Sequence, residues 1–177
     1  QLEILEFIRS LGIEATSSDR TVIAPLELDV YVPERKFAIE FNGLYWHSAA
    51  VQTDACYHER KVRECSKLNV SLFHVFEDEW RDRRDLVKSM IKHRLGKFVE
   101  RIGARRLSVR SISVSEARKF FDENHLDGYV PAKINLALVD ASGRICAALS
   151  LRRPFHAKYS SFFEVGRSCS RVELNVP

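Results

Sequence analysis

Two neighbouring apolar segments, each carrying a carboxylate, most constrain how this chain can fold. Residues 26–32 have the sequence LELDVYV and residues 36–41 have the sequence KFAIEF, with Pro-Glu-Arg between them. Short runs of β-branched and aromatic residues on either side of a proline-containing turn predict a pair of β-strands. Asp29 lies in the first strand and Glu40 in the second, so the fold must accommodate two acids in segments that otherwise look buried.

A bound cation is one way to accommodate both acids. Side chains two residues apart on a strand share a face, so Glu40 is expected beside Ala38 and Asn42, and Asp29 is expected on the same face of the adjacent strand. Burying a carboxylate is costly unless a positive charge compensates it, and two carboxylates repel each other. Mg²⁺ takes oxygen ligands from one or two carboxylates and from phosphate groups. The pair therefore predicts a magnesium site at Asp29 and Glu40.

The alternative is that these acids need no metal. Either carboxylate could lie exposed on an edge strand or pair with Arg35 or Lys36 in the turn between the strands. We favour the metal for the pair because a glycine turn and a histidine, His47, follow the second strand.

His47 is the natural candidate for a general base. It follows the Asn42-Gly43 turn, which places it at the end of the acidic strand. An imidazole titrates near neutrality and can take a proton from water that attacks phosphorus. The preceding Tyr45 and Trp46 form either a hydrophobic plug or a wedge that stacks on nucleobases.

His58 lies in a predicted helix over residues 55–68, whose expected core stripe also includes Val62 and Cys65. The helix leads into a strand over 70–76, so its first turns can approach the site, and catalytic and structural roles for His58 weigh equally. His74 is expected to be structural. The cysteine spacing fits no common zinc pattern, which favours the reduced thiols of a cytosolic protein.

The element order predicts a mixed α/β fold. A helix that connects two strands favours parallel pairing, so we expect a mixed sheet with helices on both faces. Further helices are predicted over 2–11 and 82–95, and a short strand over 21–24. No apolar run is long enough to span a membrane, and no signal peptide is visible. The first residue, Gln1, suggests a fragment of a longer protein.

Charge divides the chain unevenly. Residues 1–96 contain 14 Lys and Arg against 16 Asp and Glu, a net charge of −2, whereas residues 97–177 contain 14 against 8, a net charge of +6. An excess of positive charge suits a polyanionic partner. We predict a first domain over 1–96, a basic linker over 97–110 and a smaller α+β domain over 111–177.

The stretch from Asp29 to His47 resembles a known family. Asp29 followed eighteen residues later by His47, with Gly43-x-Tyr45-Trp46 before the histidine, is similar to the very-short-patch-repair mismatch endonucleases. It is also similar to their relatives among phage homing endonucleases, the EDxHD group. Both belong to the restriction-endonuclease-like superfamily, and the resemblance covers roughly residues 1–95.

The resemblance implies a Mg²⁺-dependent endonuclease that hydrolyses phosphodiester bonds in double-stranded DNA, with Mn²⁺ expected to substitute. By position, Glu3 would orient metal-bound water or the histidine, Asp29 and the carbonyl of Phe41 would bind metal, and His47 would be the base. Tyr45 and Trp46 would be the DNA wedge. A phage or mobile element in the host cytoplasm is the implied setting.

The chain departs from the family at two places. A family acid falls near His58, and Glu40 with Asn42 resembles the wider superfamily's Asp…Glu-x-Lys arrangement, with Asn42 where Lys is usual. Asn42 would then contact DNA. The alternatives are an inactive nuclease-like DNA-binding module, a mismatch-repair nicking enzyme, and an acetyltransferase-type second half, which residues 107–177 weakly resemble.

The second half is expected to position DNA. Basic side chains there would contact phosphates, although a solvated basic surface is the plain alternative. The candidates are Arg105, Arg106, Arg110, Arg152, Arg153 and Lys158.

Overall fold

The computed structural model of the protein describes residues 1–43, 55–154 and 162–176. The chain divides into two compact units, Gln1–Val87 and Lys88–Pro177. The predicted linker over 97–110 is not a plain connection, because its last residues form a strand of the second unit. Of the helices in the described ranges, none is long and apolar enough to cross a membrane.

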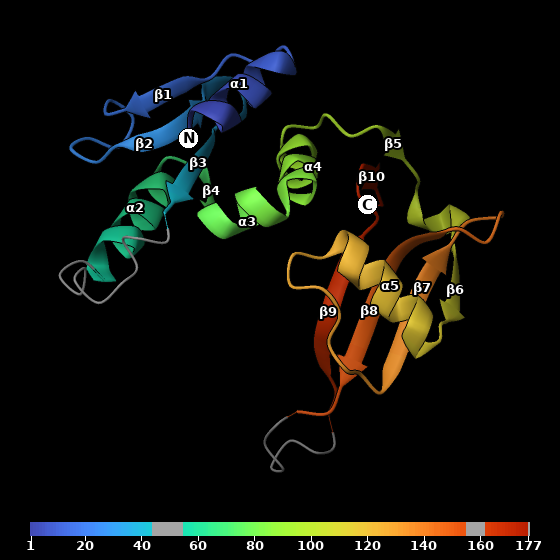
Figure 1. Ribbon diagram of the computed structural model, residues 1–177. Helices are drawn as coiled ribbons and strands as arrows, with labels where there is room; N and C mark the ends of the chain where they lie inside the picture. Colours follow the sequence, from blue (N-terminus) through green and yellow to red (C-terminus); the bar gives the residue numbers. More distant parts are fainter. Residues whose placement is uncertain (44–54, 155–161, 177) are drawn as a thin grey trace. The chain divides into compact units, whose positions relative to one another are not determined.

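The first unit is built on a four-stranded sheet in the order β1-β2-β3-β4 (Figure 1). The β1-β2 and β2-β3 pairs are antiparallel and the β3-β4 pair is parallel, because the second helix crosses over between β3 and β4. The mixed sheet flanked by helices confirms the predicted fold class. The strands are β1 (Thr16–Asp19), β2 (Leu28–Val32), β3 (Phe37–Asn42) and β4 (Ser71–Phe76), with η1 (Pro33–Arg35) between β2 and β3.

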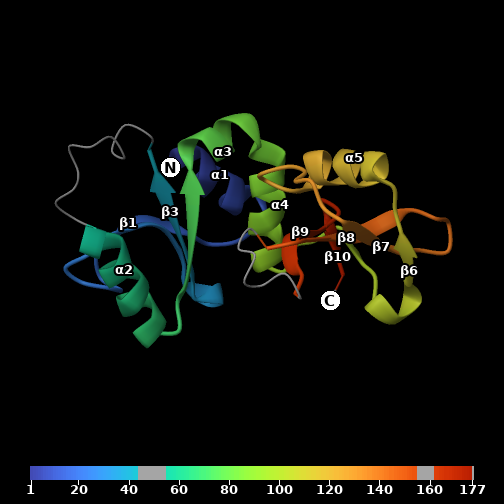
Figure 2. The same ribbon diagram turned by 90° about the horizontal axis from the view of Figure 1, so that it is seen from below.

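Helices cover both faces of this sheet. The helix α1 (Leu2–Ser10) lies on one face and α2 (Ala55–Lys67) on the other (Figures 1 and 2). Alternation along the strands explains this, since Val30 and Ile39 are buried on one face while Ala38 and Glu40 are buried on the opposite face. The sheet is therefore a buried middle layer, and Glu40 lies on its α2 side.

The helix predicted over 82–95 is confirmed as α4 (Arg84–Arg94), and a helix that the sequence did not predict, α3 (Glu77–Asp82), precedes it. The α3 helix begins directly after β4 because Glu79 reaches back to accept a hydrogen bond from the Phe76 amide at 3.0 Å. The strand predicted over 21–24 is a turn, in which the Asp19 carboxylate accepts a hydrogen bond from the Thr21 amide at 2.8 Å.

The second unit contains an antiparallel sheet in the order β6-β7-β8-β9, with a helix on one face. The helix is capped by Ser113, and its buried Phe120 and Phe121 pack with Ala137 and Ala148 of the sheet. The elements are β6 (Ser108–Ser111), α5 (Val114–Asn124), β7 (Ile134–Val139), β8 (Ile145–Arg152) and β9 (Glu164–Ser170). A parallel pair, β5 (Glu100–Arg101) and β10 (Leu174–Asn175), and the short helix η4 (Ala104–Arg106) complete the unit.

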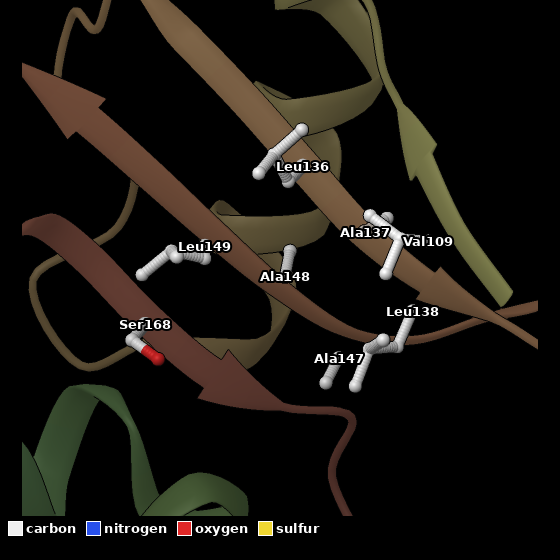
Figure 3. A pocket seen from close by; sticks show the side chains of 8 residues that line it. All are labelled: Val109, Leu136, Ala137, Leu138, Ala147, Ala148, Leu149 and Ser168. Atoms are coloured by element: carbon white, nitrogen blue, oxygen red, sulfur yellow. The ribbon is translucent and has the colours of Figure 1, made fainter. Parts of the chain in front are cut away.

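The face of this second sheet that points away from α5 is apolar. A shallow cavity of about 280 Å³ lies there, and its lining is almost entirely aliphatic (Figure 3). Such a face does not suit phosphate groups, so any DNA contact in this unit has to come from its basic side chains elsewhere. The lining residues are Val109, Leu136, Ala137, Leu138, Ala147, Ala148, Leu149 and Ser168.

Gly166→Ala is expected to destabilise the second unit by about 1–3 kcal/mol, because overpacking of a filled core has that cost. A Cβ at Gly166 would lie 3.0 Å from the Ser150 Oγ and 3.1 Å from Val130 Cγ1, and Ser150 is fully buried. Faster amide hydrogen exchange in β8 and β9 would report the loss. Gly103→Ala is the matched control, since a Cβ there meets open space and the backbone φ is −63°. Equal exchange rates in the two variants would contradict the prediction.

Candidate active site

Asp29 and Glu40 lie on the same face of the sheet. The antiparallel register pairs Val30 with Ile39 and Tyr31 with Ala38, and continuing it brings Asp29 opposite Glu40. The Asp29 Oδ2 accepts a hydrogen bond from the Phe41 amide at 2.8 Å. This bond directs the Asp29 carboxylate toward the end of β3, where Phe41 and its carbonyl lie.

Glu40 forms a buried ion pair with a residue that the sequence did not single out. Its Oε1 lies 2.5 Å from the Nζ of Lys61 in α2, and the side chains are only 9% and 2% exposed. The Lys61 Nζ also lies 4.9 Å from the ring centroid of Tyr57. Glu40 thus pairs with a basic residue, as the alternative without a metal predicted. The partner is Lys61, however, and not Arg35 or Lys36.

Glu40 and Lys61 affect each other's charge states, and Asp29 affects that of Glu40. Burial raises the pKa of the Glu40 carboxyl, the hydrogen bond from Lys61 opposes this shift, and the charge of Asp29 raises the pKa again. Burial lowers the pKa of Lys61, but its hydrogen bond to Glu40 and the charge of Glu40 outweigh burial and raise the pKa above the usual value. Lys61 is therefore an ammonium, and a second positive charge beside Glu40 and Asp29 would be favourable.

One atom of Glu40 provides a direct test of whether a metal fits. The Oε2 is buried and, among the residues that the structure describes, has no hydrogen-bond partner. Buried carboxylate oxygens are normally satisfied, so this atom calls for a ligand. A hard dication bound by Glu40 Oε2, the Asp29 carboxylate and the Phe41 carbonyl would meet that need with oxygen ligands alone. The residues present therefore fit Mg²⁺ or Mn²⁺.

The described ranges contain no group of three or more His, Cys, Asp and Glu side chains that could hold a metal ion. The fitting set has only two such side chains, so a carbonyl, water and substrate oxygens would have to complete the coordination. His47, Tyr45 and Trp46 fall between residues 44 and 54, outside the described residues.

Glu3 belongs to α1 and lies near Phe41, the residue that follows Glu40. The Glu3 Oε2 accepts a hydrogen bond from the Trp80 indole at 2.8 Å and forms an ion pair with Arg84 at 2.9 Å. Glu3, Trp80, Arg84 and Phe41 line an open hollow of about 570 Å³, together with other residues of α1 and α3. The structure thus brings Glu3 and Phe41 to one concave surface.

Asn42 does not occupy the position expected of a DNA contact. It is 7% exposed, and its Nδ2 lies 3.2 Å from the Nδ1 of His74. The sequence predicts Asn42 as a DNA contact and also places it at the position where the superfamily usually has lysine. The correction follows from β4, since the register that pairs Glu40 with His74 brings a polar partner beside Asn42 inside the fold.

The predicted core stripe of α2 is confirmed at Cys65 and wrong at His58 and Val62. His58 is exposed and Val62 is 43% exposed, whereas Lys61 is buried on the same side of the helix as Cys65. The helix is rotated so that Lys61 reaches Glu40. Hydrophobic spacing cannot find this residue, because lysine counts as polar. The signal that could have found Lys61 is Glu40 itself, because a buried acid on a strand requires a positive charge from the helix that covers it.

The basic residues proposed for DNA contact differ in their surroundings. Arg105 and Arg106 are exposed on η4. Arg110 pairs with Glu116 at 3.0 Å and Arg152 with Glu164 at 2.6 Å, so these arginines serve the fold of the second unit at least in part. The Arg153 guanidinium lies 4.7 Å from the ring centroid of Phe163. Lys158 lies outside the described residues.

Comparisons with known proteins give a weak likeness to a solved structure. No model of a protein family matches the chain, and no curated protein matches it. Among solved structures, it is similar to the catalytic domain of the homing endonuclease I-Bth0305I. The match has 25% identity and a TM-score of 0.44, and covers 54% of this chain and 91% of that one. The assignment below therefore depends on the side chains already described.

Proposed function

We propose that this protein is a Mg²⁺-dependent endonuclease that cleaves double-stranded DNA, with Mn²⁺ as a substitute ion. The observation that carries the proposal is the buried Oε2 of Glu40 beside the Asp29 carboxylate. This oxygen has no hydrogen-bond partner among the described residues. Two acids on one sheet face suit a metal-assisted hydrolysis of phosphodiester bonds, and Phe41, which follows Glu40 in the chain, lines an open hollow.

In this proposal each residue has a separate task. Asp29, Glu40 and the Phe41 carbonyl would hold the ion, which when bound polarises the scissile phosphate and stabilises charge on the leaving oxygen. Lys61 holds Glu40 in place through its buried ion pair. Glu3, fixed by Trp80 and Arg84, orients the attacking water.

The remaining tasks concern the base and the DNA. His47 takes the proton of the attacking water, and Tyr45 and Trp46 contact bases near the cut. Exposed basic side chains of the second unit, with Arg105 and Arg106 foremost, bind backbone phosphates. A homing endonuclease of a phage or mobile element is the setting that we propose.

A second candidate is a DNA-binding module without cleavage activity. The observation that favours it is the Lys61–Glu40 pair, which already compensates one carboxylate without any metal. This candidate shares the DNA partner and differs only in the chemistry.

The proposal predicts that Mg²⁺ converts supercoiled plasmid or a randomised duplex library to nicked or linear product, and that EDTA abolishes this conversion. Removing the ion removes the electrostatic stabilisation of the leaving oxygen, so the loss should be complete on the assay's timescale. Mn²⁺ should restore cleavage. A folded protein that binds DNA but cuts no duplex with either ion would favour the inactive module instead.

A further inference from the structure

Three polar side chains form a line on the sheet face that carries Glu40. Asn42 Nδ2 lies 3.2 Å from His74 Nδ1, and the ring of His74 lies 5.9 Å from that of His58 at an interplanar angle of 69°. His74 is also the register partner of Glu40 in the parallel pair β3-β4. The line therefore runs from the proposed metal site to the first turns of α2.

The middle member of this line, His74, is half-buried and hydrogen-bonded to Asn42. In the tautomer that carries the ring proton on Nε2, its Nδ1 accepts the hydrogen bond from the Asn42 amide. Burial lowers the pKa of His74, and the neighbouring His58 and Lys61 lower it further. These contacts suit His74 to orienting a neighbouring side chain.

His58 differs from His74 in its exposure. It is exposed, so it can meet a ligand, yet its ring lies between His74 and the ring of Tyr57, whose centroid is 5.9 Å away at 80°. The helix α2 runs antiparallel to β3 and β4, which brings its first turns toward the carboxyl ends of both strands (Figure 2). An accessible imidazole in contact with His74 thus lies in the first turns of α2.

In the proposed reaction, Glu3 and His58 would act from opposite faces of the sheet. In a phosphoryl-transfer reaction the attacking and leaving oxygens lie roughly in line on opposite sides of phosphorus. Glu3, the residue proposed to orient water, belongs to α1 on one face, whereas His58 belongs to α2 on the other face. Water that attacks from the α1 side would place the leaving oxygen on the side of His58.

We propose that His58 is the catalytic residue that donates a proton to the leaving oxygen, and that His74 and Asn42 are positioning residues for it. This inference rests on the proposed nuclease function. The bond from phosphorus to the leaving oxygen breaks as the bond to the water oxygen forms. The proton of the His58 imidazolium passes to the leaving oxygen, giving a hydroxyl, and solvent reprotonates the neutral ring.

A substrate with sulfur in place of the leaving oxygen tests this role, because a thiolate departs without protonation. His58→Gln should slow single-turnover cleavage of the oxygen substrate by about 10²-fold or more, the usual contribution of general acid catalysis. On the sulfur substrate it should cleave at the wild-type rate. His58→Asn is a second variant of the same exposed position. His93→Gln, at an exposed histidine of α4, is the control and should change neither rate.

Asn42→Ala and His74→Phe should show the same selective loss on the oxygen substrate, since both disturb His58 only indirectly. In the wild-type protein, ¹⁵N chemical shifts should show His74 protonated on Nε2, and Asn42→Ala should mix the tautomers. Equal losses on both substrates, or no loss for His58→Gln, would overturn the proton-donor role alone. A wild-type protein that cleaves neither substrate would instead overturn the nuclease function on which the role depends.

Discussion

Asp29→Asn is expected to abolish metal-dependent cleavage while DNA binding survives. Asparagine keeps an oxygen that can accept the hydrogen bond from the Phe41 amide, so β2 and β3 should remain paired. It removes the negative charge that a dication needs as a ligand. Loss of several kcal/mol of transition-state stabilisation corresponds to a rate decrease of about 10³-fold or more.

Single-turnover nicking and fluorescence anisotropy with labelled duplex measure the two effects separately. Manganese electron paramagnetic resonance measures ion binding directly. Glu27→Gln is the matched control, because it removes a carboxylate two residues away that pairs with Arg20. Cleavage by Asp29→Asn at the rate of Glu27→Gln would rule out Asp29 as a metal ligand.

Lys61→Met is expected to destabilise the first unit by about 3–5 kcal/mol, the usual effect of removing one partner of a buried ion pair. The side chain of Lys61 is 2% exposed, and its loss leaves the carboxylate of Glu40 buried without its counterion. Adding Glu40→Gln to Lys61→Met should recover much of the loss, because the remaining amide carries no charge.

Urea unfolding followed by tryptophan fluorescence is the appropriate measurement. Both tryptophans, Trp46 and Trp80, belong to the first unit, so the signal does not report unfolding of the second. Val62→Met is the control, since it places the same side chain at an exposed neighbouring position of α2. A double variant as unstable as Lys61→Met would show that packing of the lysine stem, rather than charge pairing, dominates.

The sequence located the main strands and helices of the first unit, but it did not predict which face of α2 is buried. Alternation of apolar residues, together with the turn at Pro33, located β2 and β3 and brought Asp29 and Glu40 to one face. This works because strand periodicity and hydrogen-bond register are local properties. The rotation of α2 depends instead on the contact between Lys61 and Glu40, which are 21 residues apart. No local pattern contains that information.

The same limit explains the unexpected surroundings of Asn42 and Glu3. Asn42 meets His74 only because β4 pairs in parallel with β3, and Glu3 meets Trp80 across 77 residues of chain. Which polar side chains satisfy one another is decided by tertiary packing. Sequence spacing could therefore identify the two acids but not the residues that orient them.

The aliphatic face of the second sheet has a practical consequence for preparing the protein. Val109 is 70% exposed and Val165 is 59% exposed, so this surface favours self-association at the concentrations needed for crystallisation. Both belong to strands, where threonine keeps the branched shape that valine has. Val109→Thr and Val165→Thr are thus the natural solubility variants, since they leave the packing beneath α5 unchanged.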